Sequence, residues 1–223
     1  MIWKKRHRSF YYKYADDPED IILKSNETAH LVIDVQNTYL EQKSNPKEND
    51  EWQPFFNRMS NVLIPNIKSL ISFLREKKVE NIFARIACLK ESGIDRSLSQ
   101  KKPGFNYLLL PKNIPSGQIV NELKPKLEDI VMIKTTDSAL TGTNLRLVLS
   151  NMGIKNVICT GIFTDQCVSS TVRSLADESF NVIVVEDCCA AATDELHQHE
   201  LEIINMIYCH VVTLDEVKTF FVD

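Results

Sequence analysis

Three residues whose side chains suit a covalent catalyst follow apolar, strand-like runs. Asp34 ends such a run in HLVIDVQNTYL, Lys134 ends one in VMIKTTDSALTGTNL, and Cys167 belongs to the turn GIFTDQC. Ligands of open parallel sheets gather beyond the carboxyl ends of the strands, which makes these side chains candidates for one shared site. Singly, each has an ordinary structural use, as a turn cap, a snorkelling cation or a small core residue. Together they supply a base, a cation and a nucleophile, which is the set that covalent catalysis requires.

The surroundings of the cysteine favour this interpretation. If Thr164 or Asp165 caps the helix that follows the turn, Cys167 lies in its first turn, where amide N–H groups are free. The positive end of the helix dipole and nearby Lys134 are expected to lower the thiol pKa into the range of about 3.5–7.5, with Asp34 partly opposing them. The same amides can hold an oxyanion, and Asp34 can take the thiol proton and later give one to a leaving nitrogen.

The remaining pattern indicates how these residues are positioned. Short β-branched runs alternate with longer helical patterns, which predicts a three-layer α/β/α domain with a parallel sheet covered on both faces. We expect strands at Ala29–Ile33, Asn81–Ile86, Ile130–Ile133, Asn156–Thr160, Val182–Val185 and His210–Thr213. We expect helices at Phe55–Lys77, Thr143–Asn151, Asp165–Glu178 and Asp194–Ile207. Glu41–Asp50 is polar and predicted to be a mobile loop, and Lys90–Lys126 is irregular and a candidate cover for a pocket.

The composition fits one soluble domain. The chain has 223 residues, of which 43% are hydrophobic and 25% charged, enough to bury a substantial core. A net charge of −4 gives no general attraction to nucleic acid or anionic membranes, and no apolar run reaches the length of a membrane span. Most of the cysteines lie in or beside apolar runs, as buried thiols do, and no apolar secretory signal follows the N-terminus. We therefore expect a reduced, cytoplasmic protein with a small-molecule substrate and with neither a nucleic-acid nor a membrane partner.

Residues 1–28 precede the first expected strand as an arm, and residues 29–223 form the domain. The arm combines basic with aromatic side chains, namely Lys4, Lys5, Arg6 and Arg8 beside Phe10, Tyr11, Tyr12 and Tyr14. Such a run could contact RNA or a membrane, but one short run is weak evidence for either. A surface extension or a subunit-packing segment is the favoured interpretation.

Three ordered motifs resemble those of the isochorismatase-like cysteine hydrolases, and the similarity extends from Ala29 to Val212. The first is Asp34-Val35-Gln36-Asn37-Thr38-Tyr39, and the second is Lys134 followed by Ser138-Ala139-Leu140-Thr141-Gly142-Thr143-Asn144-Leu145. The third is Gly161-Ile162-Phe163-Thr164-Asp165-Gln166-Cys167-Val168. A fourth stretch, VVEDCCAA followed by ELH, resembles the end of the family's fifth strand and the helix after it.

The resemblance implies a Rossmann-like fold with a six-stranded parallel sheet. It also implies a catalytic triad of Asp34, Lys134 and Cys167. The resemblance further implies a cis peptide between Ile162 and Phe163. It also implies that the backbone N–H groups of Phe163 and Cys167 donate to the oxyanion. Members of the family are commonly dimers or larger, so a homo-oligomer is expected.

Departures from the family pattern narrow the chemistry. Isochorismatases proper cleave a vinyl ether and often lack the cysteine, so Cys167 favours C–N cleavage through a thioester. Nicotinamidases carry a metal site with an Asp-x-His pair after the second strand. Ile86 and Cys88 stand at the corresponding positions, and the five histidines offer no cluster there. No metal and no other cofactor is therefore expected.

The leading hypothesis is a metal-free hydrolase for a small amide, ureido or carbamoyl compound. Arg85, at a strand end, could bind a substrate carboxylate, although a structural ion pair is an equal alternative. Tyr39 and Phe163 are candidate walls of the substrate pocket. The alternatives are an isochorismatase-type vinyl-ether hydrolase and a non-catalytic binding or scaffold member of the family.

Overall fold

One parallel sheet organises the chain. In the computed structural model, which describes residues 2–103 and 108–222, six strands pair in the order β3-β2-β1-β4-β5-β6. They are β1 (Thr28–Ile33), β2 (Glu80–Ile86), β3 (Ile130–Lys134), β4 (Asn156–Ile162), β5 (Asn181–Ala190) and β6 (His210–Val212). All five pairings are parallel, and the order changes direction between β1 and β4. The expected six-stranded sheet is confirmed, and Asp34 follows β1 at this change of direction, where such sheets bind ligands.

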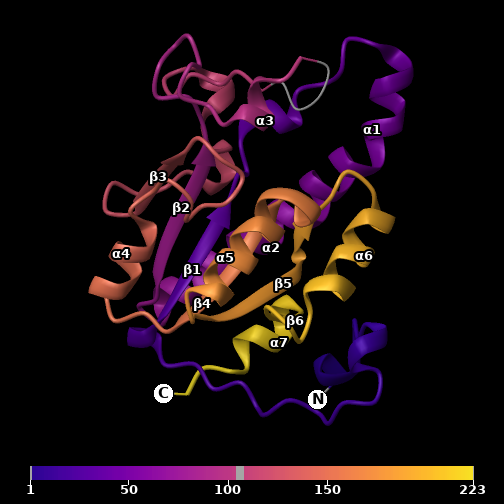
Figure 1. Cartoon of the computed structure of the whole chain (residues 1–223), viewed down its shortest axis with the longest axis vertical. Coiled ribbons are helices and arrows are strands. Elements are labelled where there is room, and N and C mark those ends of the chain that lie inside the picture. The colour runs from indigo at the N-terminus through magenta and orange to yellow at the C-terminus, as the bar shows by residue number, and fades with distance from the viewer. Residues whose placement is uncertain (1, 104–107, 223) are drawn as a thin grey trace.

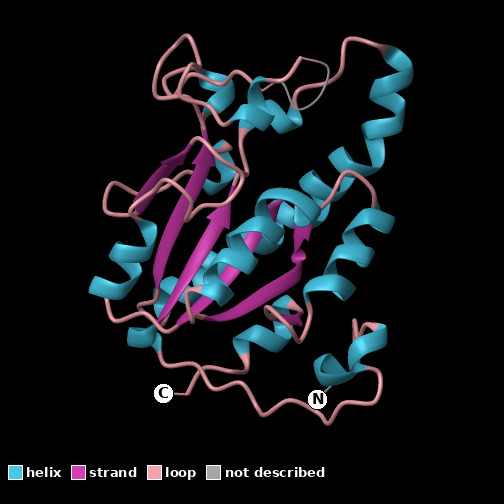
Figure 2. Ribbon diagram, in the orientation of Figure 1, coloured by secondary structure: helices cyan, strands magenta, loops and turns pink. Residues whose placement is uncertain are grey.

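Helices cover both faces of the sheet, as its apolar strands require (Figures 1 and 2). One apolar layer packs under α1 (Pro46–Arg58), α2 (Ile64–Glu76) and α7 (Leu214–Lys218). The other layer packs under α4 (Leu145–Asn151), α5 (Ser169–Asp177) and α6 (Asp194–Ile204). This is the three-layer α/β/α arrangement expected from the alternation of strands and helices.

The prediction of a mobile loop at Glu41–Asp50 is wrong in its second half. Helix α1 begins at Pro46, and the side chain of Asn45 accepts a hydrogen bond from the backbone N–H of Lys47. Asparagine before proline is a favourable helix start, because the amide caps the helix and proline needs no N–H at its first position. The helix then continues through a π turn at Met59–Leu63 into α2, where the sequence predicted one helix from Phe55.

The first part of the irregular segment Lys90–Lys126 lies beyond the carboxyl ends of the strands, at the top of Figure 1, and its last residues return along the sheet to the start of β3. It contains one short helix, α3 (Leu98–Lys101), and single 3-10 turns, and residues 104–107 lie outside the described residues. Gln36 donates from its side-chain amide to the carbonyls of Ile86 and Gly117. That glutamine therefore attaches the segment to the end of β2, next to Asp34.

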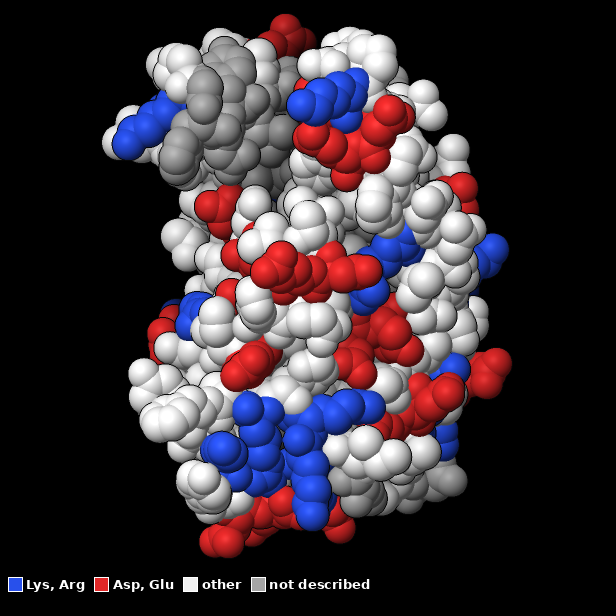
Figure 3. Space-filling view, turned by 90° about the vertical axis from the view of Figure 1, so that its right-hand side faces the viewer, with Lys and Arg blue, Asp and Glu red and all other residues white. Residues whose placement is uncertain are grey.

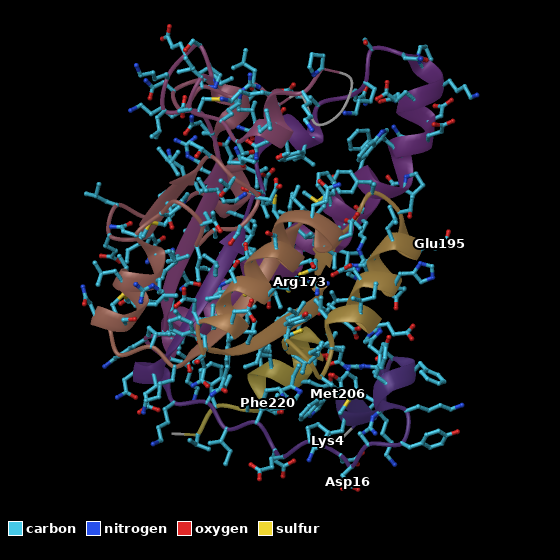
Figure 4. All side chains as sticks on the ribbon, viewed as in Figure 1. Lys4, Asp16, Arg173, Glu195, Met206 and Phe220 are labelled. Atoms are coloured by element: carbon cyan, nitrogen blue, oxygen red, sulfur yellow. The ribbon has the colours of Figure 1, made fainter. Side chains whose placement is uncertain are left out.

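The arm packs against its own chain. Trp3 is buried edge-on against His210 and Phe220, and Leu23 forms a parallel bridge with Phe221. Arg6 pairs with two glutamates, Glu186 of β5 and Glu216 of α7. Figure 4 shows Lys4 and Phe220 at the same end of the molecule, opposite α3.

The basic residues of the arm face acidic ones. Figure 3 shows lysine and arginine side chains gathered at the lower end of one face, with acidic side chains beside them. Lys4 pairs with Asp20, Arg8 with Asp17, and His7 with Glu186. Much of the positive charge is thus neutralised within the chain, which weakens the case for an RNA-binding arm. No helix in the described part of the chain combines the length and hydrophobicity that crossing a membrane requires.

Candidate active site

Asp34 is fixed by the backbone at the end of β1. Its φ of +55° turns the chain sharply, and its own N–H donates to the carbonyl of Ala84 at 2.8 Å. The backbone N–H of Ile86 donates both to Asp34 Oδ1 at 2.7 Å and to Gln36 Oε1 at 2.9 Å. The Asp-x-Gln motif thus joins β1 to the end of β2 and leaves the second carboxylate oxygen of Asp34 facing the site.

Lys134 occupies the facing position at the end of β3. Its Nζ is 2.6 Å from Asp34 Oδ2 and donates to the carbonyl of Thr136 at 3.1 Å. Burial by itself lowers the lysine pKa, but Asp34 and Cys167 together outweigh it and raise the pKa. The ammonium therefore stays protonated although its side chain is fully buried.

The environment of the Asp34 carboxyl favours its neutral form. Its pKa is raised, because burial outweighs the opposing effects of Lys134 and of the hydrogen bonds from Cys167 and Ile86. A carboxyl with a raised pKa beside a protonated lysine is suited to take up and return a proton. Asp34 and Lys134, predicted from separate strand ends, are therefore brought into direct contact.

The turn after β4 presents Cys167 to this pair. Thr164–Val168 forms a π turn that continues into α5. In a regular α-helix the carbonyl of Phe163 would accept the N–H of Cys167. Here that carbonyl accepts from Gln166 at 3.0 Å and from Val168 at 3.1 Å, bonds that skip the amide of Cys167. The sequence predicted a helix start at this position but not the π turn.

The thiol of Cys167 is not activated at rest in the way the sequence suggested. Its pKa is raised well above the ordinary value, first by burial and then by Asp34, against the lowering effect of Lys134. Asp137 adds to the increase, and the thiol donates to Asp137 Oδ1 over 3.9 Å. The expectation of a lowered pKa is therefore wrong, because it counted the helix dipole and the lysine but not the burial and the second carboxylate. The resting group is a neutral thiol.

The turn is anchored by a histidine from α6. Neither Thr164 nor Asp165 caps it: the N-cap residue is Phe163, with no side-chain hydrogen bond. The hydroxyl of Thr164 instead lies 2.8 Å from His197 Nδ1, and Arg58 Nη2 lies 2.9 Å from His197 Nε2. An arginine can only donate, so Nε2 is the acceptor and the Nδ1–H donates to Thr164.

The same histidine is held in its neutral form. Burial, with Arg58 as a further cause, lowers the pKa of His197 to about 3. The sequence does not indicate this role of His197, because its partners come from distant segments.

A close approach of backbones fixes the end of β4. Gly161 has φ +120°, and a Cβ atom there would lie 2.0 Å from the carbonyl oxygen of Ile33. No other residue fits this position without displacing β1. The peptide bond between Ile162 and Phe163 is cis.

Aromatic side chains cluster around Phe163, just before the turn that carries Cys167. The ring of Phe163 lies 5.3 Å from Tyr39, 6.1 Å from Trp52 and 5.2 Å from Phe55, centroid to centroid. The pKa of Tyr39 is raised well above its ordinary value by burial and by the charges of the Asp34, Cys167 and Asp137 side chains. Tyr39 and Phe163 are therefore close to the candidate triad, and their contact with substrate stays a prediction. Neither Trp52 nor Phe55 was singled out from the sequence: Trp52 precedes the predicted helix, and Phe55 is its first residue.

Arg85 is engaged with the backbone of the Lys90–Lys126 segment. It donates to the carbonyl of Gly117 at 2.8 Å and to that of Lys112 at 2.9 Å. These bonds give the guanidinium a structural role that uses two of its nitrogens. A role for Arg85 in binding substrate stays a prediction.

A metal site was not expected from the sequence. Among the residues that the structure describes, the His, Cys, Asp and Glu side chains form no group of three or more that could hold a metal ion. Ile86 and Cys88, at the positions where nicotinamidases carry ligands, are buried at the end of β2. Independence from metals stays a prediction that a chelator can test.

The chain is similar to known hydrolases in sequence and in fold. Ureidoacrylate amidohydrolase RutB of Agrobacterium fabrum is 31% identical over 183 residues, which cover 76% of this chain and 78% of that protein. The enzyme of the same description from Pseudomonas savastanoi is 28% identical over 218 residues, covering 92% and 87%.

Two solved structures illustrate the shared fold. A cysteine hydrolase from Pseudomonas syringae has a TM-score of 0.75 at 19% identity and covers 92% of this chain and 98% of that one. N-carbamoylsarcosine amidase from Thermoplasma acidophilum has a TM-score of 0.66 at 20% identity, covering 85% and 97%. The family model described as the isochorismatase domain matches residues 28–216, which is most of the chain. By this match, and with the six-stranded parallel fold in agreement, the chain belongs to the isochorismatase family.

Proposed function

We propose that the protein is a cysteine hydrolase that cleaves the C–N bond of a small amide, ureido or carbamoyl compound through a thioester. The observation that carries the proposal is the buried ion pair of Lys134 and Asp34, 2.6 Å apart, beside the thiol of Cys167. The three side chains are 0%, 1% and 5% exposed, which favours a small substrate that the site can enclose.

In the first half of the reaction, Asp34 takes the proton of the Cys167 thiol while the sulfur attacks the carbonyl carbon. The resting thiol is neutral, so this transfer coincides with the attack rather than preceding it. Lys134 stabilises the negative charge that develops on the sulfur and on Asp34. The oxyanion accepts from the backbone N–H groups of Phe163 and Cys167. Asp34 then returns the proton to the leaving nitrogen, the C–N bond breaks, and an amine or ammonia departs.

In the second half, water replaces the amine. Asp34, again ionised, takes a proton from the water as its oxygen attacks the thioester carbonyl. The C–S bond breaks, the proton on Asp34 passes to the sulfur, and the acid is released. One water is consumed for each C–N bond, and the enzyme returns to its starting state.

The names of the relatives support the amide or ureido class, since two of the similar proteins are described as ureidoacrylate amidohydrolases and one as an N-carbamoylsarcosine amidase. Vinyl-ether hydrolysis is the alternative within the family, and it would give Cys167 no bond to form. A scaffold role is a further alternative, and it would leave the buried ion pair without a purpose.

The experiment compares ammonia release from a panel of amides, ureido and carbamoyl compounds with hydrolysis of isochorismate. Reactions are also quenched in acid and the peptide that contains Cys167 is weighed by mass spectrometry. We expect ammonia release from at least one C–N substrate and a mass increase equal to its acyl group. Turnover of isochorismate alone would establish the vinyl-ether alternative, and no turnover of any compound would favour the scaffold role.

A further inference from the structure

A second carboxylate faces the nucleophile from the loop after β3. Asp137 Oδ1 accepts from the thiol of Cys167 over 3.9 Å, a long and weak contact even for sulfur. Asp137 also acts on the pKa values of Cys167 and of Tyr39, as Asp34 does. Two carboxylates therefore border the sulfur, and only one of them is paired with Lys134.

Asp137 is hydrogen-bonded to the irregular segment Lys90–Lys126. The side-chain amide of Gln100, in α3, donates to Asp137 Oδ1 at 3.3 Å. Gln100 is buried, and its backbone carbonyl accepts from Arg96 Nη1 at 3.1 Å. Asp137 is partly exposed, so the carboxylate is oriented by a fixed donor and remains open to a ligand.

The two carboxylates match a feature that separates ureido compounds from simple amides. The carbonyl carbon of an amide carries one nitrogen, which leaves when the bond is cleaved. The carbonyl carbon of a ureido or carbamoyl-amine compound carries two, and the second stays on the acyl group with its N–H. A carboxylate next to the sulfur is a good acceptor for that retained N–H, because hydrogen bonds to charged groups are strong.

We propose that Asp137 is a specificity-determining residue that selects ureido compounds over simple amides by accepting the N–H of the nitrogen retained on the acyl group. The inference rests on the proposed function. Asp34 serves the nitrogen that leaves, and Asp137 holds the one that stays. An amide would place a methylene against Asp137, which would partly desolvate the carboxylate without giving it a further donor.

The test uses substrate pairs that differ only by NH against CH2, such as 3-ureidopropanoate against 4-carbamoylbutanoate and methylurea against propionamide. The value of kcat/KM from ammonia release is measured for both members with wild type, Asp137→Ala and Asp137→Asn. Dividing the ureido-to-amide ratio of wild type by that of a variant removes the intrinsic difference in reactivity between the two compounds. We expect Asp137→Ala to lower the ureido-to-amide ratio about 10- to 100-fold, and Asp137→Asn to lower it less, because its amide oxygen still accepts.

Asp95→Asn is the matched control. Asp95 lies in the same segment, Lys90–Lys126, and accepts from the backbone N–H groups of Leu89 and Lys90. Replacing its carboxylate therefore perturbs the segment without removing the carboxylate beside the sulfur. We expect the ureido-to-amide ratio of this control to stay at the wild-type value. An equal fall in the control and in Asp137→Ala would overturn the inference.

A second measurement needs no substrate. Because Asp137 raises the thiol pKa, Asp137→Asn should shift the onset of iodoacetamide labelling of Cys167 to lower pH.

An unchanged ureido-to-amide ratio in an active Asp137→Ala enzyme would overturn the inference while leaving the proposed function standing. Absence of C–N hydrolysis in wild type would overturn the proposed function and the inference with it.

Discussion

In the proposed reaction, the resting charge state of the three buried groups decides how the first step begins. Lys134 is protonated, Cys167 is a thiol, and Asp34 has a raised pKa, so the site carries no stable thiolate. A buried thiolate without substrate would be exposed to oxidation and would repel Asp34. Ionisation coupled to attack avoids both, since the proton moves only when an electrophilic carbon is in reach.

Removing the sulfur should remove the reaction. In Cys167→Ala we expect no acyl-enzyme and a fall in kcat of at least about 1,000-fold, because no neighbouring group replaces the nucleophile. The melting temperature should change by only a few degrees, since alanine removes one side-chain atom, the sulfur that contacts Asp34 and Asp137. Cys167→Ser should also be poor, because an alcohol ionises far less than a thiol. Ammonia release and thermal unfolding are measured together, and full activity in Cys167→Ala would exclude the mechanism.

The effect of Lys134 should be measurable in the reactivity of the Cys167 thiol. The ammonium lowers the pKa of Cys167 against the larger effect of burial, so Lys134→Met should raise that pKa further. The sign follows from charge: without the cation, the thiolate is less stable and forms at higher pH. The rate of iodoacetamide labelling at Cys167, followed by peptide mass spectrometry from pH 6 to 10, should move to higher pH. An unmoved profile would contradict the electrostatic role given to the lysine.

Among the elements, the π turn at Thr164–Val168 depends on α6. His197 donates to Thr164 and accepts from Arg58, whose Nε also donates to the carbonyl of Cys189 in β5 at 3.1 Å. The turn that carries Cys167 is therefore joined to α6 and α1 through His197, and to β5 through Arg58.

His197→Ala should loosen that turn. We expect kcat to fall about tenfold or more with a smaller change in KM, because a displaced oxyanion site costs most in the transition state. The buried hydroxyl of Thr164 loses its partner, which should lower stability by about 1–3 kcal/mol. His199→Ala is the control, since that side chain is exposed on the same helix. Equal effects of the two variants on kcat would refute the positioning role.

Strand ends were easier to predict from the sequence than the loops between them. Asp34 and Lys134 follow runs whose apolar pattern identifies buried strands, so their meeting at one edge followed from parallel pairing. Asp137 lies three residues beyond Lys134, but its orientation depends on Gln100 in α3, a helix of four residues with no periodic signal. The start of α1 was missed for another reason: the Asn45-Pro46 start was present, but the polar residues around it were taken for a loop.

For the whole molecule, a buried histidine links stability to pH. His30, in β1, is within hydrogen-bonding distance of Asn81 at 2.8 Å and of Thr160 at 2.9 Å, and burial lowers its pKa to about 4. Between about pH 6.5 and 4 the unfolded chain binds a proton there that the folded chain does not. Stability from this group is complete above the unfolded pKa and is lost as the pH falls towards the folded one.

Urea unfolding at several pH values between 7 and 4.5 measures this loss. His30 should contribute a decrease of about 1.4 kcal/mol per pH unit in the lower part of the range. His30→Gln should unfold with a smaller dependence on pH by the equivalent of one proton, although it starts from a lower stability. The buried His197 adds a similar slope that remains in this variant. The same slope in wild type and His30→Gln would contradict the assignment.

The arm connects the first and last parts of the chain. Leu23 exchanges backbone hydrogen bonds with Phe220 and Val222, and Arg6 pairs with Glu216. During translation these residues are made before their partners, so the indole of Trp3 stays exposed to water until β6 and α7 have been synthesised. The arm therefore cannot dock on Phe220 before α7 has been synthesised.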